Sequence, residues 1–315
     1  MKNKNNNSEL IYFICSTFMY GVGFSSIFKL CKNDSWLVIL IGSIISLIIL
    51  PIYNKLTKDS KLIKSINITF ILLINLMILR ILTTSFYLTK TPGLLITIPF
   101  ILLCLYNSKK GISTISKESN ILFIFSIITI VLNLLASTKT GSITFFLPLM
   151  HTKKINIIKG IIYYIVYIIS PLVLVNNNSN YKSDIKFFLI INILILFMSI
   201  IIIFVLGPNL ITMLRFPEYM IYKEINLFGF IENVENLVGL VYYINLFITS
   251  SLCLYTLKSI VKHNYIIYLI IVSILVITEF VSDKYKYSLL IYKYLPQILI
   301  TLVILYIFNY ILKKE

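Results

Sequence analysis

The sequence predicts an all-α integral membrane protein with about ten transmembrane helices, from its composition and from its long apolar runs. Hydrophobic residues make up 58% of the 315 residues, charged residues only 13%, and the mean hydropathy is +0.93. A soluble globular domain has about a quarter charged residues and just under half apolar ones. A water-soluble body of this size cannot hide the excess apolar surface, so lipid is the predicted solvent.

Ten apolar runs account for most of the chain. A membrane span needs about 20 apolar residues, and the fourth and fifth runs are short, so they either extend into their polar flanks or lie buried among other helices. The runs are Leu10–Leu30, Trp36–Tyr53, Ile66–Leu88, Gly93–Tyr106, Ile121–Ala136, Ile155–Val175, Ile185–Leu206, Leu237–Leu257, Tyr265–Val281 and Leu295–Leu312. Residues 1–315 are therefore expected to form a single transmembrane domain, without a soluble one.

The net charge of +16 lies almost wholly in the short polar segments between these runs. Lysines at such positions anchor in the lipid headgroup region and set the orientation. With the N-terminus placed in the cytoplasm, the inside segments hold slightly more basic residues than the outside segments, which favours this orientation. Nucleic-acid binding is not expected, because the chain offers no soluble module to carry a basic face.

Helix breakers lie well inside two of the spans. Gly21, Val22 and Gly23 stand at the midpoint of the first, followed by Ser25, and Ser170 with Pro171 lies inside the sixth. When ten helices are split into repeats of about 10–136 and 155–312, these are the first helices of the two halves. A repeat of five spans must be inverted in the membrane, and matched breaks in inverted halves indicate a transporter-type binding site. The alternatives stay open, because Gly permits close helix packing and Pro often only kinks a helix.

A polar stripe runs along the eighth span. Its members recur at spacings of three and four residues, which places them on one helix face. Such a face contacts other helices or a water-filled pathway rather than lipid, and both interpretations remain open. The stripe comprises Glu235, Gly239, Tyr242, Asn245, Thr249, Cys253 and Thr256, and Tyr242, Asn245 and Thr249 are its candidate ligand-binding residues.

Four ionisable residues near the membrane are functional candidates, and Arg80, Glu232 and Glu235 are the ones expected to have a structural or gating role. An ionisable group inside a span is costly and by default suggests function. Arg80 and Glu279 lie toward the ends of their spans, where Arg80 can also snorkel to the surface. Glu232 and Glu235 lie at the start of the eighth span, where a carboxylate also stabilises the helix dipole. Pro217 joins this group, within the longest connection, Gly207–Asn236, where one or two short amphipathic helices are expected at the surface.

Sequence signals of an enzyme are missing. The two histidines, His151 and His263, sit in polar connections, and the sequence has no paired-histidine metal spacing, Gly-rich phosphate loop or Gly-x-Ser-x-Gly elbow. We therefore expect no catalytic residue, metal or cofactor. A membrane enzyme acting on lipid or polysaccharide is the least favoured alternative, because it needs a convergent acid–base or metal cluster.

The order of motifs along the chain resembles the B-subunit permeases of spore-germination nutrient receptors, a branch of the amino acid–polyamine–organocation transporter superfamily. The strongest stretch runs from Gly207-Pro208 through Phe216-Pro217 to the segment 230–235, Phe-Ile-Glu-Asn-Val-Glu. Further matches, in the same order over nearly the whole chain, are Asp34-Ser35-Trp36, Thr91-Pro92, Gly111 with Lys117, Leu147-Pro148 and Lys159-Gly160.

Some positions depart from the family's pattern. Asn233 replaces an arginine, Tyr242 replaces a tryptophan, and Ser170-Pro171 stands where the family has Gly-Glu, so that the acidic group of the sixth helix is missing. The chain is also shorter than usual between the second and third spans.

The resemblance implies an inverted-repeat transporter fold with broken first and sixth helices. It further implies the membrane subunit of a germinant receptor in the spore inner membrane or bacterial cell membrane, with a small nutrient such as an amino acid bound between the two breaks. A larger membrane subunit and a lipoprotein are the implied partners, beside the lipid bilayer. An amino-acid permease that transports its ligand is the alternative.

Overall fold

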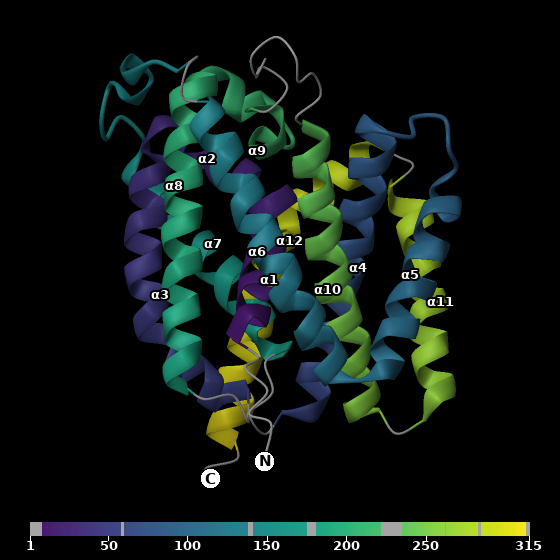
Figure 1. Ribbon diagram of the computed structural model, residues 1–315. Coiled ribbons are helices and arrows are strands. Elements are labelled where there is room, and N and C mark those ends of the chain that lie inside the picture. Colours follow the sequence, from purple (N-terminus) through teal and green to yellow (C-terminus); the bar gives the residue numbers. More distant parts are fainter. Residues whose placement is uncertain are drawn as a thin grey trace.

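The computed structural model describes residues 8–57, 60–137, 141–174, 181–221, 235–261, 263–282 and 285–312. Every element in these ranges is helical, and Figure 1 shows the long helices standing side by side as one bundle, with α1 beginning and α12 ending at the same end. The elements are α1 (Ser8–Phe18), η1 (Met19–Gly23), α2 (Phe24–Cys31), η2 (Lys32–Asp34), α3 (Ser35–Thr57), α4 (Lys61–Phe86), α5 (Gly93–Lys110), α6 (Ile112–Ser137), η4 (Ile143–Phe146), α7 (Lys154–Ile169), η5 (Ser170–Leu174), α8 (Tyr181–Met213), α9 (Pro217–Met220), α10 (Glu235–Ile260), α11 (Asn264–Ser282) and α12 (Tyr285–Leu312).

Nine stretches among the described residues are long and apolar enough to cross a membrane. The first, Glu9–Thr57, has 49 residues, more than twice the length of about 20 that a bilayer needs. The chain turns at η2, and α3 runs back along the bundle beside α2 (Figure 1). Ten spans were predicted from the sequence, and the described residues contain nine candidate stretches, because this first stretch contains two of the predicted spans.

The two short predicted spans extend into their polar flanks, which was one of the two outcomes expected. α5 continues past Tyr106 to Lys110, and α6 begins at Ile112 rather than Ile121. The helix of the seventh predicted span also extends beyond Leu206. Gly207 (φ 70°, ψ 166°) kinks it, and a further helical segment begins at Pro208 and ends at Met213. Proline suits the first turn of a helix, whose N–H groups have no intrahelical partner.

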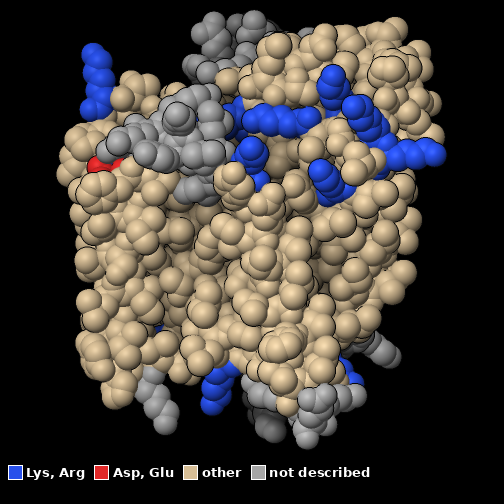
Figure 2. All heavy atoms as spheres, turned by 180° about the vertical axis from the view of Figure 1, so that it is seen from behind, with Lys and Arg blue, Asp and Glu red and all other residues tan. Residues whose placement is uncertain are grey.

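The surface has the composition expected of a protein in lipid. Large apolar side chains are exposed on many helices, including Ile48 on α3, Leu103 on α5 and Phe280 on α11. Figure 2 shows a broad face without charged side chains, with lysine and arginine side chains above and below it. Basic residues at both edges of an apolar belt are typical of membrane–water interfaces, so the protein is a multi-pass membrane protein.

The broken first span lies at the centre of the bundle. Every side chain from Leu10 to Ser25 is buried, and a helix that is buried on all sides must be surrounded by other helices. It packs against α6, α7, α8 and α10. The first predicted breaker is thus placed in the core, away from lipid.

A polar corner at η2 ties α2 and α3 to the connection before α7. Asp34 is fully buried and accepts hydrogen bonds from the backbone N–H of Met150 (2.7 Å) and of Thr152 (3.0 Å) and from the Thr152 hydroxyl (2.7 Å). Asn33 donates from Nδ2 to the Pro148 carbonyl at 2.6 Å. The corner holds the two halves of the sequence together at one end of the bundle.

Replacing Asp34 with alanine is expected to destabilise the protein by about 1–3 kcal/mol, because three part-buried donors lose their acceptor. The measurement is the unfolding midpoint of the purified protein in detergent. Thr152→Val removes a single one of the three bonds and serves as the milder comparison. An Asp34→Ala midpoint equal to that of the wild type would show that the corner contributes nothing to stability.

Candidate functional site

The backbone of the first span opens at η1. Tyr20 (φ −74°, ψ 122°) and Gly21 (φ +94°, ψ −26°) leave the helical conformation, and α2 begins three residues later at Phe24. Only glycine adopts such a positive φ without strain. The break frees the backbone N–H of Gly21 from the helix, so a buried donor needs another partner.

Glu218 of α9 supplies that partner. The Gly21 N–H donates to Glu218 Oε1 at 2.7 Å, and the Glu218 side chain is fully buried. This carboxyl group lies just before α2, where the positive end of a helix dipole favours an anion. The break in the first span is thus closed by an acidic side chain from the connection between α8 and α10.

Aromatic packing holds α9 in this position. Phe216 packs edge-on against Phe86 at the end of α4, with ring centroids 5.8 Å apart, and Tyr219 lies 4.4 Å from Phe86. The Tyr219 hydroxyl donates to the Tyr87 hydroxyl at 3.0 Å. The residues 216–219 are all buried. The expectation of surface helices in this connection was therefore wrong for α9, because its aromatic residues find partners inside the bundle, and Pro217 opens this buried turn.

Burial also changes the acidity of Glu218, which lies between two candidate spans. Desolvation raises the pKa of its carboxyl group from 4.5 to about 7, and hydrogen bonds with Tyr242 and the Gly21 N–H offset only part of that cost. The group therefore gains and loses its proton near neutral pH.

The folded protein is expected to lose stability as pH rises from about 5 to about 8. The pKa of Glu218 is higher in the folded protein than in the unfolded chain, so between these two pKa values the folded state binds more protons. The free energy of unfolding therefore falls by on the order of 2–3 kcal/mol as the pH rises through the folded pKa. Glu218→Gln keeps a carbonyl oxygen for the Gly21 N–H but cannot titrate. The check is the unfolding midpoint of both proteins at each pH, and an identical pH dependence in the two would contradict the assignment.

The polar stripe of α10 meets α1 and α4. Asn245 Nδ2 donates to the Ser16 hydroxyl, and Thr17 donates to Asn245 Oδ1 at 3.4 Å. One turn further, Asn75 of α4 donates from Nδ2 to the Thr249 hydroxyl at 3.0 Å. Tyr242 packs against Tyr20 of η1, with ring centroids 5.4 Å apart, so the three predicted residues of the stripe form a buried polar column beside the break.

The second predicted break, η5, is buried in the bundle, where it packs against α1, α4, α7 and α10. Ser170 and Pro171 begin η5, directly after α7. The Ser170 carbonyl accepts from the Tyr53 hydroxyl at 3.2 Å and from Asn67 Nδ2 at 3.5 Å. Among the described hydrogen bonds, Ser170 is connected to α3 and α4 and not to η1. Hydrogen bonds thus join Gly21 to α9 and Ser170 to α3 and α4, while η5 also packs against α1 and α10.

Val22 and Ser25 line an open pocket of about 360 Å³. The pocket lies between α2, α7 and α12. Its other lining residues are Ser26, Lys29, Leu30, Lys159, Tyr163, Lys293 and Gln297. Gly23 does not line the pocket, because its Cα packs against Met19 instead.

The remaining predicted residues have structural surroundings or lie outside the description. Arg80 is buried and paired with Glu279 of α11, with Nη1 to Oε2 at 2.6 Å, so neither group stands alone inside the membrane. Glu232 lies outside the described residues, and Glu235 is described only as the first residue of α10. Within the described ranges no group of three or more His, Cys, Asp or Glu side chains could hold a metal ion.

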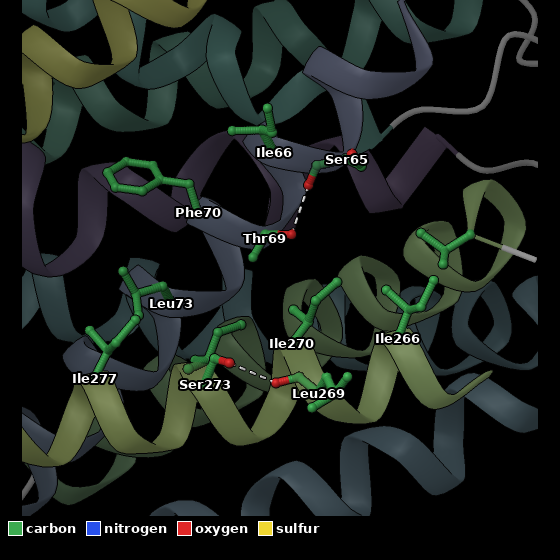
Figure 3. Close-up of a pocket in the computed structure, with 12 residues that line it drawn as sticks. Ser65, Ile66, Thr69, Phe70, Leu73, Ile266, Leu269, Ile270, Ser273 and Ile277 are labelled. Carbon is green, nitrogen blue, oxygen red and sulfur yellow. Dashed lines mark hydrogen bonds between the residues drawn. The ribbon is translucent and has the colours of Figure 1, made fainter. Parts of the chain in front are cut away.

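A larger groove of about 560 Å³ lies between α4 and α11, and it is lined almost entirely by apolar side chains (Figure 3). Its hydroxyl groups are already used within their own helices. Thr69 donates to the Ser65 carbonyl at 2.8 Å and Ser273 to the Leu269 carbonyl at 2.8 Å. The groove therefore offers no polar contacts that would orient a small polar ligand.

Sequence reasoning missed Glu218, although it singled out its neighbour Pro217. An acidic residue in a polar connection is normally solvated, so its type alone gives no signal. The one available signal was its place in the segment Phe-Pro-Glu, within the stretch of strongest family resemblance.

The bundle, its broken first span and its buried polar column define a multi-pass helical membrane protein of the permease type. Comparison with known proteins agrees. A family model described as spore germination protein, the spore permease family, matches residues 61–278, which is more than half of the chain. Spore germination protein XB of Bacillus anthracis is 22% identical over 301 residues, covering 84% of this chain and 84% of that protein. The chain belongs to the spore germination permease family.

Proposed function

We propose that this protein is the membrane subunit of a spore germinant receptor and that a small nutrient, an amino acid, acts at the η1 break. The observation that carries the proposal is the bond between the Gly21 N–H and the Glu218 carboxyl group. Interrupted helices in membrane proteins present such N–H groups to the carboxylate of a bound molecule. The Glu218 carboxyl group on α9 thus occupies the position at which the carboxylate of a bound nutrient is expected.

This arrangement supplies the two states that a sensor needs. A ligand shifts a conformational equilibrium only by binding one state better than another. A nutrient carboxylate that replaces Glu218 on the Gly21 N–H favours the state in which α9 has left the break. α9 contacts α2, α8 and α10. Its release therefore changes the contacts of three helices, and a partner subunit at the surface of the bundle can detect this change.

The wider organisation belongs to the same proposal. The two halves, about 10–136 and 155–312, form inverted repeats of five spans, with η1 and η5 as the corresponding breaks. The protein acts in the spore inner membrane with a larger membrane subunit and a lipoprotein. Family membership supports this organisation.

The test is germination of spores that lack the gene, against a panel of single amino acids and sugars. Loss of the response to one nutrient, restored by the wild-type gene but not by Gly23→Trp, is the expected result. A side chain at Gly23 would meet the Met19 Sδ at 2.7 Å and the Phe18 carbonyl at 3.0 Å, so the break could not keep its shape. An unchanged response to every nutrient would count against a sensor.

An amino-acid permease is the second candidate, because interrupted helices are also the sites at which transporters bind their substrates. Uptake of labelled amino acid into proteoliposomes separates the two. Concentrative or saturable uptake supports the permease, and binding without uptake supports the sensor.

A further inference from the structure

The pocket between α2, α7 and α12 carries a concentration of positive charge. Lys29, Lys159 and Lys293 line it, one from each helix, and it has no acidic lining residue. All three side chains are exposed. Like charges repel, so three ammonium groups around one pocket are unfavourable unless an anion lies among them.

Below the lysines the pocket has a neutral polar floor. On α7, Tyr163 lies four residues beyond Lys159, and on α12, Gln297 lies four residues beyond Lys293, which is one helical turn in each case. Ser25 and Ser26 complete the floor from α2. A volume of about 360 Å³ is larger than a bare inorganic anion requires, so the occupant has an anionic group for the lysines and a polar uncharged part for the floor.

The height of the pocket in the bundle also fits this chemistry. Lys29 belongs to the last turn of α2, Lys159 to the second turn of α7, and Lys293 to α12, eight residues after its start. Figure 2 shows lysine and arginine side chains gathered at one level of the face seen from behind, directly above the apolar belt. Phosphate headgroups of a bilayer lie at this level, and basic pockets between transmembrane helices bind anionic headgroups.

We propose that the pocket formed by Lys29, Lys159 and Lys293 is a binding site for the phosphate group of a glycerophosphate, whose glycerol part contacts Ser25, Tyr163 and Gln297. The lysines bind the phosphate as point charges, and the floor hydroxyl and amide groups bond the glycerol oxygens. The two sources of this group are an anionic phospholipid and a free glycerol phosphate. Glu218 does not line this pocket, and the proposal does not depend on the proposed function.

The experiment uses the full-length protein in nanodiscs, with unfolding followed by the fluorescence of Trp36, the single tryptophan. One arm compares phosphatidylcholine alone with phosphatidylcholine containing about one-fifth phosphatidylglycerol. A second arm adds free glycerol phosphate to the phosphatidylcholine discs. A ligand that binds the folded state raises the unfolding midpoint by mass action, so a rise in the first arm alone identifies a lipid, and a rise in the second identifies a free compound.

Variants locate the effect. The triple replacement Lys29→Gln, Lys159→Gln and Lys293→Gln is expected to weaken binding by about 100-fold, because three charge-assisted contacts are lost. The matched control, Lys55→Gln, Lys61→Gln and Lys110→Gln, removes the same charge from α3, α4 and α5 at the opposite end of the bundle and keeps the rise (Figure 1). If the glutamine triple does not fold, the corresponding arginine triple retains the charge and is expected to retain binding.

Two results would overturn the proposal. One is no rise in the midpoint with either phosphatidylglycerol or glycerol phosphate. The other is an equal loss of the rise in the pocket triple and in the control triple, which would assign the effect to the overall charge of the protein.

Discussion

Arg80→Ala is expected to destabilise the protein by about 2–3 kcal/mol, because it leaves the Glu279 carboxylate, which is 28% exposed, without its partner. Arg80 is 4% exposed, and its guanidinium holds Glu279 through two bonds, Nη1 to Oε2 at 2.6 Å and Nη2 to Oε1 at 3.2 Å. Nη1 also donates to the Thr278 carbonyl at 3.0 Å. The unfolding midpoint of the purified protein in detergent measures the loss.

The double replacement Arg80→Leu and Glu279→Leu is the control for this prediction. It removes both charges and replaces them with apolar side chains, which is often neutral or stabilising for a buried pair. We expect the double variant to be more stable than Arg80→Ala. An Arg80→Ala protein within about 1 kcal/mol of the wild type would show that the pair is solvated and worth no more than an exposed one.

Gly21→Val is expected to abolish the response to the nutrient while the protein still reaches the membrane. A Cβ at this position would lie 3.0 Å from Ile78 Cγ2 and 3.4 Å from Phe216 Cε1. The φ of +94° is also strained for a β-branched residue, at a cost of roughly 1–3 kcal/mol. The side chain would therefore push α4 and α9 away from the break or force η1 to change shape. Germination of spores carrying the variant measures the effect.

Gly111→Val is the matched control, because Gly111 has nearly the same φ, +95°, but no atom lies within 4 Å of a Cβ built there. It also places a β-branched residue at a positive φ, with ψ 170° and therefore at least as strained, at a turn between α5 and α6, far from η1 in the sequence. Spores with Gly111→Val are expected to keep their response. Equal losses in the two variants would mean that backbone strain alone, and not the site at η1, explains the defect.

The membrane spans were predictable because lipid imposes one simple requirement. A helix in a bilayer must be apolar over about 20 residues, and a run of this kind can be recognised from neighbouring residues alone. The break at Gly21 was predictable for a similar reason, since glycines at the middle of a span carry a local signal. The polar stripe of α10 was visible as a periodicity, and the structure places Asn245 and Thr249 against α1 and α4.

Long-range packing decided what the sequence could not show. The carboxyl group of Glu218 reaches Gly21 only because Phe216 and Tyr219 pack on Phe86, a residue far away in the chain. The partner of Arg80 lies 199 positions further along, on α11. The bonds of the Ser170 carbonyl with Tyr53 and Asn67 join residues 117 and 103 positions apart, which no local pattern indicates.

Equilibrium binding of a nutrient to the purified full-length protein tests the central claim most directly, that a small nutrient acts at the η1 break. The nutrient is the one to which spores lacking the gene no longer respond. We predict saturable binding to the wild type and to Gly111→Val, and an affinity at least about tenfold lower for Gly21→Val. Equal affinity of all three proteins would contradict the claim and place the nutrient elsewhere on the receptor.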